Sequence, residues 1–156
     1  RLAAATIATV RRISSELRPR VLDDLALVEA IEWQARDFTG RTGIEVQFEC
    51  AVAHLDLSPQ QTTSIFRIVQ EALTNILRHA QATKVNISMK EDAGELILTI
   101  KDNGRGIAED DKSGPQSLGL LGMRERAHLI SAKIDITGGD RHGTIVFLRV
   151  PISNTN

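Results

Sequence analysis

The sequence of 156 residues contains a single cysteine and few aromatic residues, and neither sign of charge dominates it. One cysteine, Cys50, excludes an internal disulfide framework and indicates a reducing compartment, so we expect a cytoplasmic location. The formal net charge of -1 provides no electrostatic basis for binding nucleic acid or an anionic membrane surface. No apolar run is long enough to cross a bilayer, and the first residues do not resemble a signal peptide.

The composition that is present is typical of one globular domain. The hydrophobic share is 42% and the charged share is 25%. The length suits a single domain with a short appendage at most. Because the chain has no initiator Met and opens within a helical pattern, we expect it to be a piece of a longer protein.

Hydrophobic spacing predicts an alternation of helices and strands. The predicted helices are an opening one that ends before Pro19 and others over residues 25–38, 58–80 and 120–130. The predicted strands are 44–50, 84–90, 95–102, 133–137 and 143–151. Helices interspersed with hairpins indicate an α+β fold, a two-layer α/β sandwich whose mixed, mostly antiparallel sheet is covered by helices.

Local signals refine this assignment. Ser58, Pro59 and Gln61 have the spacing of a capping box with proline at the first helical position, so a long helix should begin there. Asp23 or Asp24 is expected to cap the helix over residues 25–38. Cys50 ends an alternating strand, so we expect it in the core rather than as a nucleophile.

Four short stretches carry polar residues and glycines where chemistry is expected. They are EALTNILRHA, DNGRGI, GLLGMRER and GTIVF, and their candidate residues are Glu71, Asn75, Arg78, His79, Asp102, Gly104, Gly106, Gly119, Gly122 and Thr144. Glu71 and Asn75 lie one helical turn apart and therefore on one side of their helix. A carboxylate and an amide at the edge of a core cost desolvation free energy unless something binds them.

In this order, the four stretches resemble the N box, the two glycine boxes and the closing Gly-Thr strand of sensor histidine kinases. These boxes belong to an ATP-binding catalytic domain with the Bergerat (GHKL) fold, which gyrase B, Hsp90 and MutL share. Residues 16–46 and the stretch SLGLLGMRERA further resemble the nitrate-sensor and DesK type of kinase. The resemblance implies that residues 1–39 hold the second helix and linker of the dimerisation and phosphoacceptor region, and that residues 40–156 form the ATP-binding catalytic domain.

The resemblance also implies ATP and Mg²⁺ as cofactors and assigns a role to individual residues. Asn75 would supply an oxygen ligand to Mg²⁺, and Glu71 would be catalytic, either ordering a metal-bound water or acting as a base. Asp102 would accept a hydrogen bond from the exocyclic amine of adenine, assisted by Thr144 through a bound water. The other residues expected to bind the cofactor are Arg78, His79, Gly104, Gly106, Ile107, Gly119, Leu120, Gly122 and Met123.

Two segments have a further expected role in this resemblance. Residues 107–118 would form a lid over ATP, and the N–H groups of Gly119, Leu120 and Gly122 would meet the phosphates at a helix N-terminus. Gly106 is expected in a backbone conformation that other residues rarely adopt.

The implied reaction transfers the γ-phosphoryl group of ATP to a histidine on a dimerisation helix, and then to an aspartate of a response regulator. The opening helix of this chain contains no histidine, so it would not be its own phosphoacceptor. We expect the chain to be a monomer or a weak dimer, derived from a bacterial two-component kinase that is itself a homodimer. Whether that parent is anchored in a membrane stays open.

Other interpretations were weighed against this one. Taken alone, Asn75 is also compatible with an exposed helix position and Asp102 with an ordinary turn. Residues 124–126 are expected to form a solvated face, with Arg124 or Arg126 holding the lid or phosphate as the alternative. No two histidines have zinc-ligand spacing with a carboxylate or cysteine. The competing functions are an ATP-driven conformational clamp of the gyrase, Hsp90 or MutL type, an anti-sigma kinase acting on serine, and a nucleotide-binding regulatory module without kinase activity. A Rossmann site is disfavoured because DNGRGI lacks the strand–GxGxxG–helix context.

Overall fold

The computed structural model describes residues 18–106, 116–138 and 142–152, so the expected opening helix lies outside the described residues. The helical elements are α2 (Val21–Asp24), α3 (Leu27–Thr42), α4 (Pro59–Asn75), the π-helix η1 (Ile76–Ala80) and α5 (Gln116–Leu129). The strands are β1 (Glu45–Cys50), β2 (Lys84–Asp92), β3 (Glu95–Asp102), β4 (Lys133–Gly138) and β5 (Thr144–Pro151).

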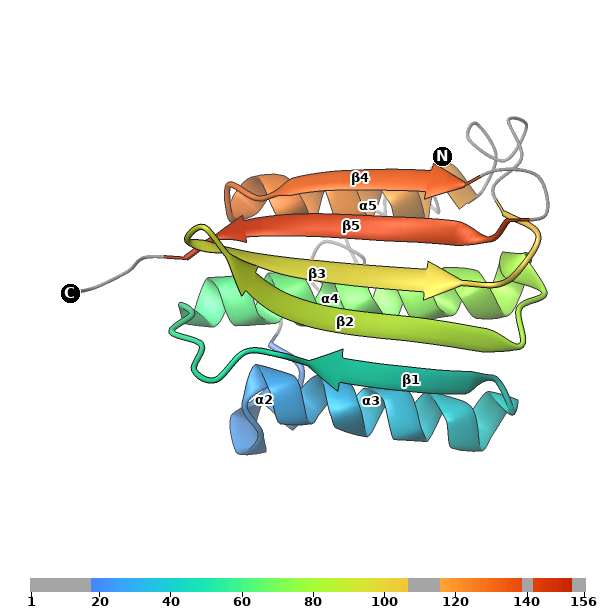
Figure 1. Cartoon of the computed structure of the whole chain (residues 1–156), viewed down its shortest axis with the longest axis horizontal. Coiled ribbons are helices and arrows are strands. Elements are labelled where there is room, and N and C mark those ends of the chain that lie inside the picture. The colour runs from blue at the N-terminus through green and yellow to red at the C-terminus, as the bar shows by residue number, and fades with distance from the viewer. Residues whose placement is uncertain (1–17, 107–115, 139–141, 153–156) are drawn as a thin grey trace, which may run out of the picture.

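The strands form one five-stranded sheet in the order β1-β2-β3-β5-β4. β1 and β2 pair in parallel, whereas the other three pairs are antiparallel. The helices lie on one face of this sheet, with α3 next to β1, α4 behind the middle strands and α5 behind β4 and β5 (Figure 1). This arrangement confirms the predicted α+β sandwich with a mixed, mostly antiparallel sheet.

Local chemistry explains why α4 begins where it does. The Ser58 Oγ atom accepts a hydrogen bond from the N–H of Gln61 at 3.1 Å, and Gln61 Oε1 accepts one from the N–H of Ser58 at 2.9 Å. With Pro59 at the first helical position, this is the predicted capping box. After Asn75 the chain continues without a break into η1, a widened turn of the kind often found at functional sites.

The start of α3 differs from the prediction. Asp23 and Asp24 lie inside the short helix α2, and α3 begins only at Leu27, after Ala26, which provides no side-chain cap. The predicted capping by an aspartate is therefore wrong. The reason is that the segment before Leu27 forms a turn of helix of its own.

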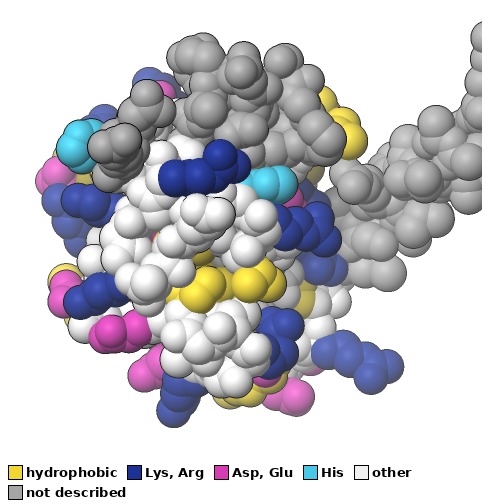
Figure 2. Space-filling model, turned by 90° about the vertical axis from the view of Figure 1, so that its right-hand side faces the viewer, with side chains coloured by type: hydrophobic (Ala, Val, Ile, Leu, Met, Phe, Trp, Pro, Cys, Tyr) yellow, Lys and Arg dark blue, Asp and Glu magenta, His cyan; other side chains and the backbone are white. Residues whose placement is uncertain are grey.

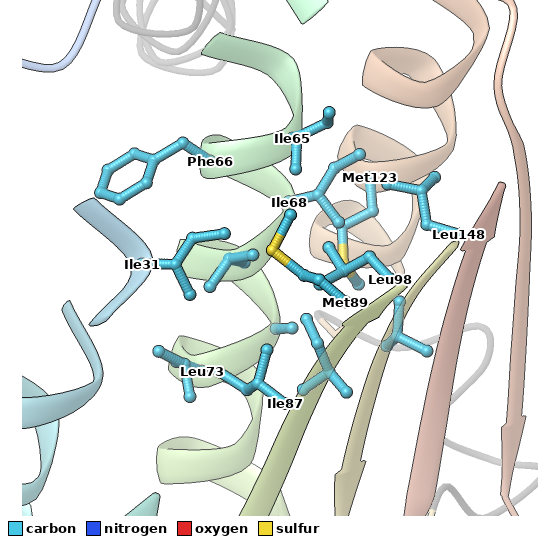
Figure 3. Packing of buried hydrophobic residues seen from close by; sticks show 14 of the residues in the cluster. Ile31, Ile65, Phe66, Ile68, Leu73, Ile87, Met89, Leu98, Met123 and Leu148 are labelled. Atoms are coloured by element: carbon cyan, nitrogen blue, oxygen red, sulfur yellow. The ribbon is translucent and has the colours of Figure 1, made fainter. Parts of the chain in front are cut away.

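The core lies between the helices and the inner face of the sheet. Ile65 and Ile68 of α4 face Met89, Leu98 and Leu148 of the strands, and all five are buried (Figure 3). Removing one such side chain from water contributes roughly 1.5–3 kcal/mol to folding. These contacts hold α4 firmly against the sheet.

Helix α3 contributes Ile31 and Phe38 to the same core cluster, and both side chains are buried. The expected division of the chain at residue 40 stays a prediction. Wherever that boundary lies, α3 packs with α4 and β1 and takes part in the same core.

Cys50 is exposed, which contradicts its predicted place in the core. β1 is an edge strand, and its burial decreases towards its last residues. The apolar alternation therefore continues one residue beyond the part of β1 that the helices cover. Within the described ranges, none of the helices has both the length and the apolar character that crossing a bilayer requires.

Candidate functional site

A pocket opens between α4 with η1, α5 and the inner face of the sheet. It encloses about 430 Å³ of empty space, including the part that is open to solvent. Its lining consists of Ala72, Asn75, Ile76, His79, Ala80, Ile100, Asp102, Gly106, Leu120, Met123, Ile136, Thr144 and Val146. A mainly apolar lining with a few polar groups is typical of a site for a small molecule. We call it the Asp102 pocket.

Figure 2 shows the molecule from the side at which α4 and β3 end. Hydrophobic side chains are exposed near the centre of this face, between Lys and Arg side chains (Figure 2). Asp and Glu side chains also lie on this face, so charges of both signs surround the apolar area (Figure 2).

Asp102 is the one carboxylate among the described residues of the lining, and hydrogen bonds hold it in place. It is the last residue of β3 and only 3% exposed. Its Oδ1 accepts a hydrogen bond from the N–H of Gly104 at 2.8 Å, and its Oδ2 accepts one from the N–H of Thr144 at 3.3 Å. Burial raises the pKa of the Asp102 carboxyl, while these two hydrogen bonds act in the opposite direction. Thr144 thus contacts Asp102 directly through its backbone.

Gly143 shapes this corner, although the sequence analysis did not select it. Its φ of +72° is in the left-handed region, and a Cβ atom there would overlap the carbonyl oxygen of Asp102. The strand carrying Thr144 approaches Asp102 so closely because residue 143 has no side chain. The pair Gly143–Thr144 at the start of the last strand was the signal that could have identified it.

The segment after Asp102 is attached to the end of η1. The backbone N–H of Arg105 donates to the carbonyl of Ala80 at 2.8 Å, and its Nε donates to the carbonyl of His79 at 2.5 Å. A Cβ atom on Gly104 would overlap the same Ala80 carbonyl. Gly106 has a φ of +80°, as expected. These contacts hold the strand end against the π-helix and so fix the shape of the pocket.

Two oxygen atoms of α4 face the start of α5. A Cβ atom on Gly119 would overlap Oε1 of Glu71 and would lie 3.2 Å from Oδ1 of Asn75. The Nδ2 atom of Asn75 is buried and has no hydrogen-bond partner among the described residues. A carboxylate and an amide oxygen this close together suit a hard cation such as Mg²⁺, which takes few protein ligands. In the described ranges, no cluster of three or more His, Cys, Asp or Glu residues could hold a metal alone.

The four polar candidates on α4 and η1, Glu71, Asn75, Arg78 and His79, do not all line one hollow. Asn75 and His79 line the Asp102 pocket, whereas Glu71 lines a second hollow on the other side of the helix. Arg78 is exposed and lines neither. The Oε1 atom of Glu71 still lies close to Gly119, where a Cβ atom would overlap it.

Helix α5 begins at Gln116, four residues before the expected Leu120. In α3 and α4 the fourth helical residues, Ala30 and Thr62, already donate to the residue before the helix, so in α5 the N–H groups without an intrahelical partner end at residue 118. The N–H groups of Gly119, Leu120 and Gly122 therefore have acceptors within the helix, contrary to the expectation that they meet the phosphates, and binding of the cofactor by these residues stays a prediction. Leu120 and Met123 contribute side chains to the lining instead.

Gly122 faces a different neighbour from the one expected. A Cβ atom there would lie 3.0 Å from Nη1 of Arg126, so the glycine leaves room for that guanidinium. Of the expected lid, Ile107 and the rest of 107–115 lie outside the described residues, and residues 116–118 belong to α5.

Much of the lining is apolar and was not selected from the sequence. These residues are Ala72, Ile76, Ala80, Ile100, Ile136 and Val146. An apolar side chain that faces a pocket has the same periodicity as one that faces the core, so the sequence contains no signal that separates them.

Comparison with known proteins places the chain among ATPases. The profile of the family described as "Histidine kinase-, DNA gyrase B-, and HSP90-like ATPase" matches residues 60–154. The sensor histidine kinase MctS of Rhizobium johnstonii is 41% identical over 122 residues, which are 77% of this chain and 26% of that protein. The oxygen sensor histidine kinase NreB of Staphylococcus carnosus is 37% identical over 145 residues, 93% of this chain and 42% of that protein.

A similar solved structure is the histidine kinase domain of the blue-light activated kinase EL346 of Erythrobacter litoralis. It is 26% identical, has a TM-score of 0.69, and is matched over 82% of this chain and 62% of that one. The chain spans less than half the length of the curated relatives that it matches. It belongs to the family of histidine kinase-, DNA gyrase B- and HSP90-like ATPases, and its relatives are the ATP-binding catalytic domains of sensor histidine kinases rather than clamps of the gyrase or Hsp90 type.

Proposed function

We propose that the chain binds ATP with Mg²⁺ in the Asp102 pocket and transfers the γ-phosphoryl group to a histidine of a dimerisation helix. From that histidine the group passes to an aspartate of a response regulator. The observation that carries this proposal is the buried, oriented carboxylate of Asp102 in an apolar pocket beside the oxygens of Asn75 and Glu71.

Asp102 selects the base. With its two oxygens oriented by Gly104 and Thr144, the carboxylate accepts a hydrogen bond from the exocyclic amine of adenine. Guanine presents a carbonyl at the corresponding position, and two facing acceptors would lose that hydrogen bond. Ile100 and Met123 provide apolar surface for the ring.

Asn75 serves as a ligand of the metal ion, and Glu71 orders a metal-bound water or takes part in proton transfer. Bound Mg²⁺ neutralises charge on the phosphate oxygens during transfer. Asn75 supplies an amide oxygen ligand, and Glu71 either orders a metal-bound water or accepts the proton of the attacking group. Gly119 leaves space beside both oxygens because it has no side chain.

His79 and Arg78 serve the phosphates from the η1 turn. His79 lines the pocket, whereas Arg78 is exposed and meets phosphate charge at the rim. The proposed partners are a histidine-bearing dimerisation helix and a response regulator, with no role for nucleic acid. The chain by itself is proposed to be a monomer or weak dimer of cytoplasmic location, and its parent a homodimer.

Calorimetric titration with ATP, with and without Mg²⁺, tests the proposal on the unmodified chain and on Asn75→Ala. We expect saturable ATP binding, and we expect Asn75→Ala to lose about tenfold in affinity only when Mg²⁺ is present, equivalent to ~1.4 kcal/mol. Asn86→Ala, an exposed amide on β2, is the matched control and should leave both titrations unchanged. No binding of ATP in either condition would overturn the proposal.

Phosphoryl transfer needs its own measurement. A dimerisation helix that carries a histidine is supplied in trans with radiolabelled ATP. We expect label on the helix that is lost when Glu71 is replaced by Gln. ATP binding without any transfer would favour the alternative of a regulatory nucleotide-binding module.

A further inference from the structure

Asn103 follows Asp102 directly and is not one of the candidate residues selected from the sequence. It is exposed, and it does not belong to the described lining of the Asp102 pocket. Its Oδ1 accepts hydrogen bonds from the N–H of Thr83 at 2.9 Å and from the N–H of Lys84 at 3.0 Å, and its Nδ2 donates to Oγ1 of Thr83 at 2.8 Å. An amide with three hydrogen bonds of this length is held in one orientation.

These bonds continue the pairing of β2 and β3 beyond its last residues. In the ladder, Val85 pairs with Asp102. The N–H of Asn103 then donates to the carbonyl of Lys84 at 3.2 Å. Beyond that point the side chain of Asn103 meets backbone N–H groups that regular strand pairing no longer reaches. The end of β3 is therefore held to the start of β2 by both the backbone and the side chain of Asn103.

The position of Asn103 influences the direction of the next peptide N–H. That N–H belongs to Gly104 and donates to Oδ1 of Asp102 at 2.8 Å. Because the peptide bond between Asn103 and Gly104 is planar, fixing Asn103 limits the directions in which this N–H can point. Oδ2 of Asp102 accepts from the N–H of Thr144 on β5 at the longer distance of 3.3 Å. The two oxygens of the carboxylate are thus held from two sides, and Asn103 acts on one of them.

The same segment is also attached to η1. A Cβ atom on Gly104 would overlap the carbonyl oxygen of Ala80, and the N–H of Arg105 donates to that carbonyl at 2.8 Å. Removing the side chain of Asn103 would leave these contacts with η1 in place. We therefore expect such a change to alter the direction of the Gly104 N–H without unfolding the domain.

We propose that Asn103 is a positioning residue for recognition of the adenine base, which orients the Asp102 carboxylate through the N–H of Gly104 without contacting the nucleotide. This inference rests on the proposed function, because it requires adenine to be the partner of Asp102. A hydrogen bond weakens steeply as its angle departs from linearity. A misdirected carboxylate therefore loses its preference for adenine over a base that presents a carbonyl at the same position.

The preference is measured as the ratio of two affinities, for ATP and for inosine triphosphate, by calorimetry. A loss of stability alone lowers both affinities by the same factor and leaves their ratio unchanged. In Asn103→Ala we expect the ratio to fall at least about threefold relative to the unmodified chain. Asn86→Ala removes an exposed amide from β2 and should leave the ratio as it is.

The conservative variant Asn103→Asp separates the hydrogen bonds from the amide itself. One carboxylate oxygen can accept from both N–H groups and the other from the hydroxyl of Thr83, so the ratio should stay within about twofold of that of the unmodified chain. A smaller fall than expected in Asn103→Ala, or an equal fall in Asn103→Asp, would overturn the inference.

Hydrogen exchange of backbone N–H groups tests the same route in the absence of nucleotide. In Asn103→Ala the N–H of Gly104 should exchange at least about fivefold faster, whereas that of Thr144 should exchange as in the unmodified chain. Equal acceleration of both would mean that the whole site loosens, and would overturn the inference. Asn103→Gln displaces the amide by one methylene group and provides the same two comparisons if Asn103→Ala does not fold.

The two measurements also separate this inference from the proposed function. Failure of the unmodified chain to bind ATP would overturn the proposed function and, with it, any role in adenine recognition. Unchanged exchange of the Gly104 N–H, in a variant of a chain that does bind ATP, would overturn the role of Asn103 alone.

Discussion

On one side of α4, the Asp102 pocket is lined mainly by apolar side chains and contains one carboxylate. On the other side lies a second hollow, whose described lining includes three guanidiniums, two side-chain amides and the carboxylate of Glu71. Both sites are open to solvent, and both involve α5 as a second wall. The difference arises within one helix of 17 residues and the π-turn that follows it.

The difference teaches that neighbouring polar residues on a helix need not serve one site. Glu71 and Asn75 are one turn apart, yet they line different hollows, and a Cβ atom added at Gly119 would lie close to an oxygen of each. Gly119 therefore marks the point at which the two sides meet. A substitution that changes one of the two hollows and leaves the other unaffected would support this distinction. A substitution that changes both would contradict it.

The largest effect is expected for Asp102→Asn on the apolar side. The carboxylate is replaced where adenine should bind, so ATP affinity should fall about 100-fold, equivalent to ~2.7 kcal/mol. Asp135→Asn makes the same change at an exposed position on β4 and should leave affinity unchanged. Calorimetry measures ATP binding by both variants. An Asp102→Asn chain that binds ATP normally would contradict the assignment.

Gly119→Ala comes next and acts where the two sides meet. The added methyl group would displace the end of the Glu71 side chain, so we expect about a tenfold loss of Mg²⁺-dependent ATP affinity. Gly40→Ala is the control, because it adds the same group to α3 with nothing within 4 Å. It should raise the free energy of unfolding by up to about 1 kcal/mol through helix propensity alone. Equal ATP affinities for the two variants would show that Gly119 does not shape the site.

Ser58→Ala should weaken the helix without altering either side. Its hydroxyl accepts from the N–H of Gln61, so its loss should lower the free energy of unfolding by about 1 kcal/mol. Thermal or urea unfolding measures the change. The ATP affinity of this variant should equal that of the unmodified chain. A change would mean that the start of α4 influences the Asp102 pocket.

The smallest expected effect is on the pH dependence of the free energy of unfolding, to which the Asp102 carboxyl should contribute. Because burial raises the pKa of Asp102 in the folded chain, its protonated form favours folding. That stabilisation is complete below the unfolded-state pKa and is lost as the pH rises through the folded-state pKa. Relative to Asp102→Asn, the unmodified chain should therefore lose stability as the pH rises from the acidic range to neutrality. Thermal unfolding of both chains at acidic and at neutral pH measures this difference, and equal changes in the two chains would contradict it.

Much of the fold could be predicted because its signals are local. The capping box at Ser58 and the alternation that gives β3 depend on residues close in sequence, and the structure has both. The start of α5 at Gln116 was missed, because the glycines and polar residues around it favour a loop. The burial of Arg126 also has no local signal, since it depends on how α3, α4 and α5 come together.

The candidate site shows the same limit. The polar residues and glycines that make up its boxes could be selected from the sequence, and Asn75, His79, Asp102, Gly106 and Thr144 do line one pocket. Helix periodicity alone could not show that Glu71 lines the second hollow, because this residue lies at the border between the two sides of α4. The π-turn after Asn75 changes the periodicity just where Arg78 and His79 follow.

The central claim is that the Asp102 carboxylate recognises the exocyclic amine of adenine. Calorimetric titration of the unmodified chain with ATP and with inosine triphosphate, which has a carbonyl in place of that amine, tests it most directly. The account predicts that ATP binds at least tenfold more tightly, equivalent to ~1.4 kcal/mol for the hydrogen bond to a charged group. Equal affinities for the two nucleotides would contradict it.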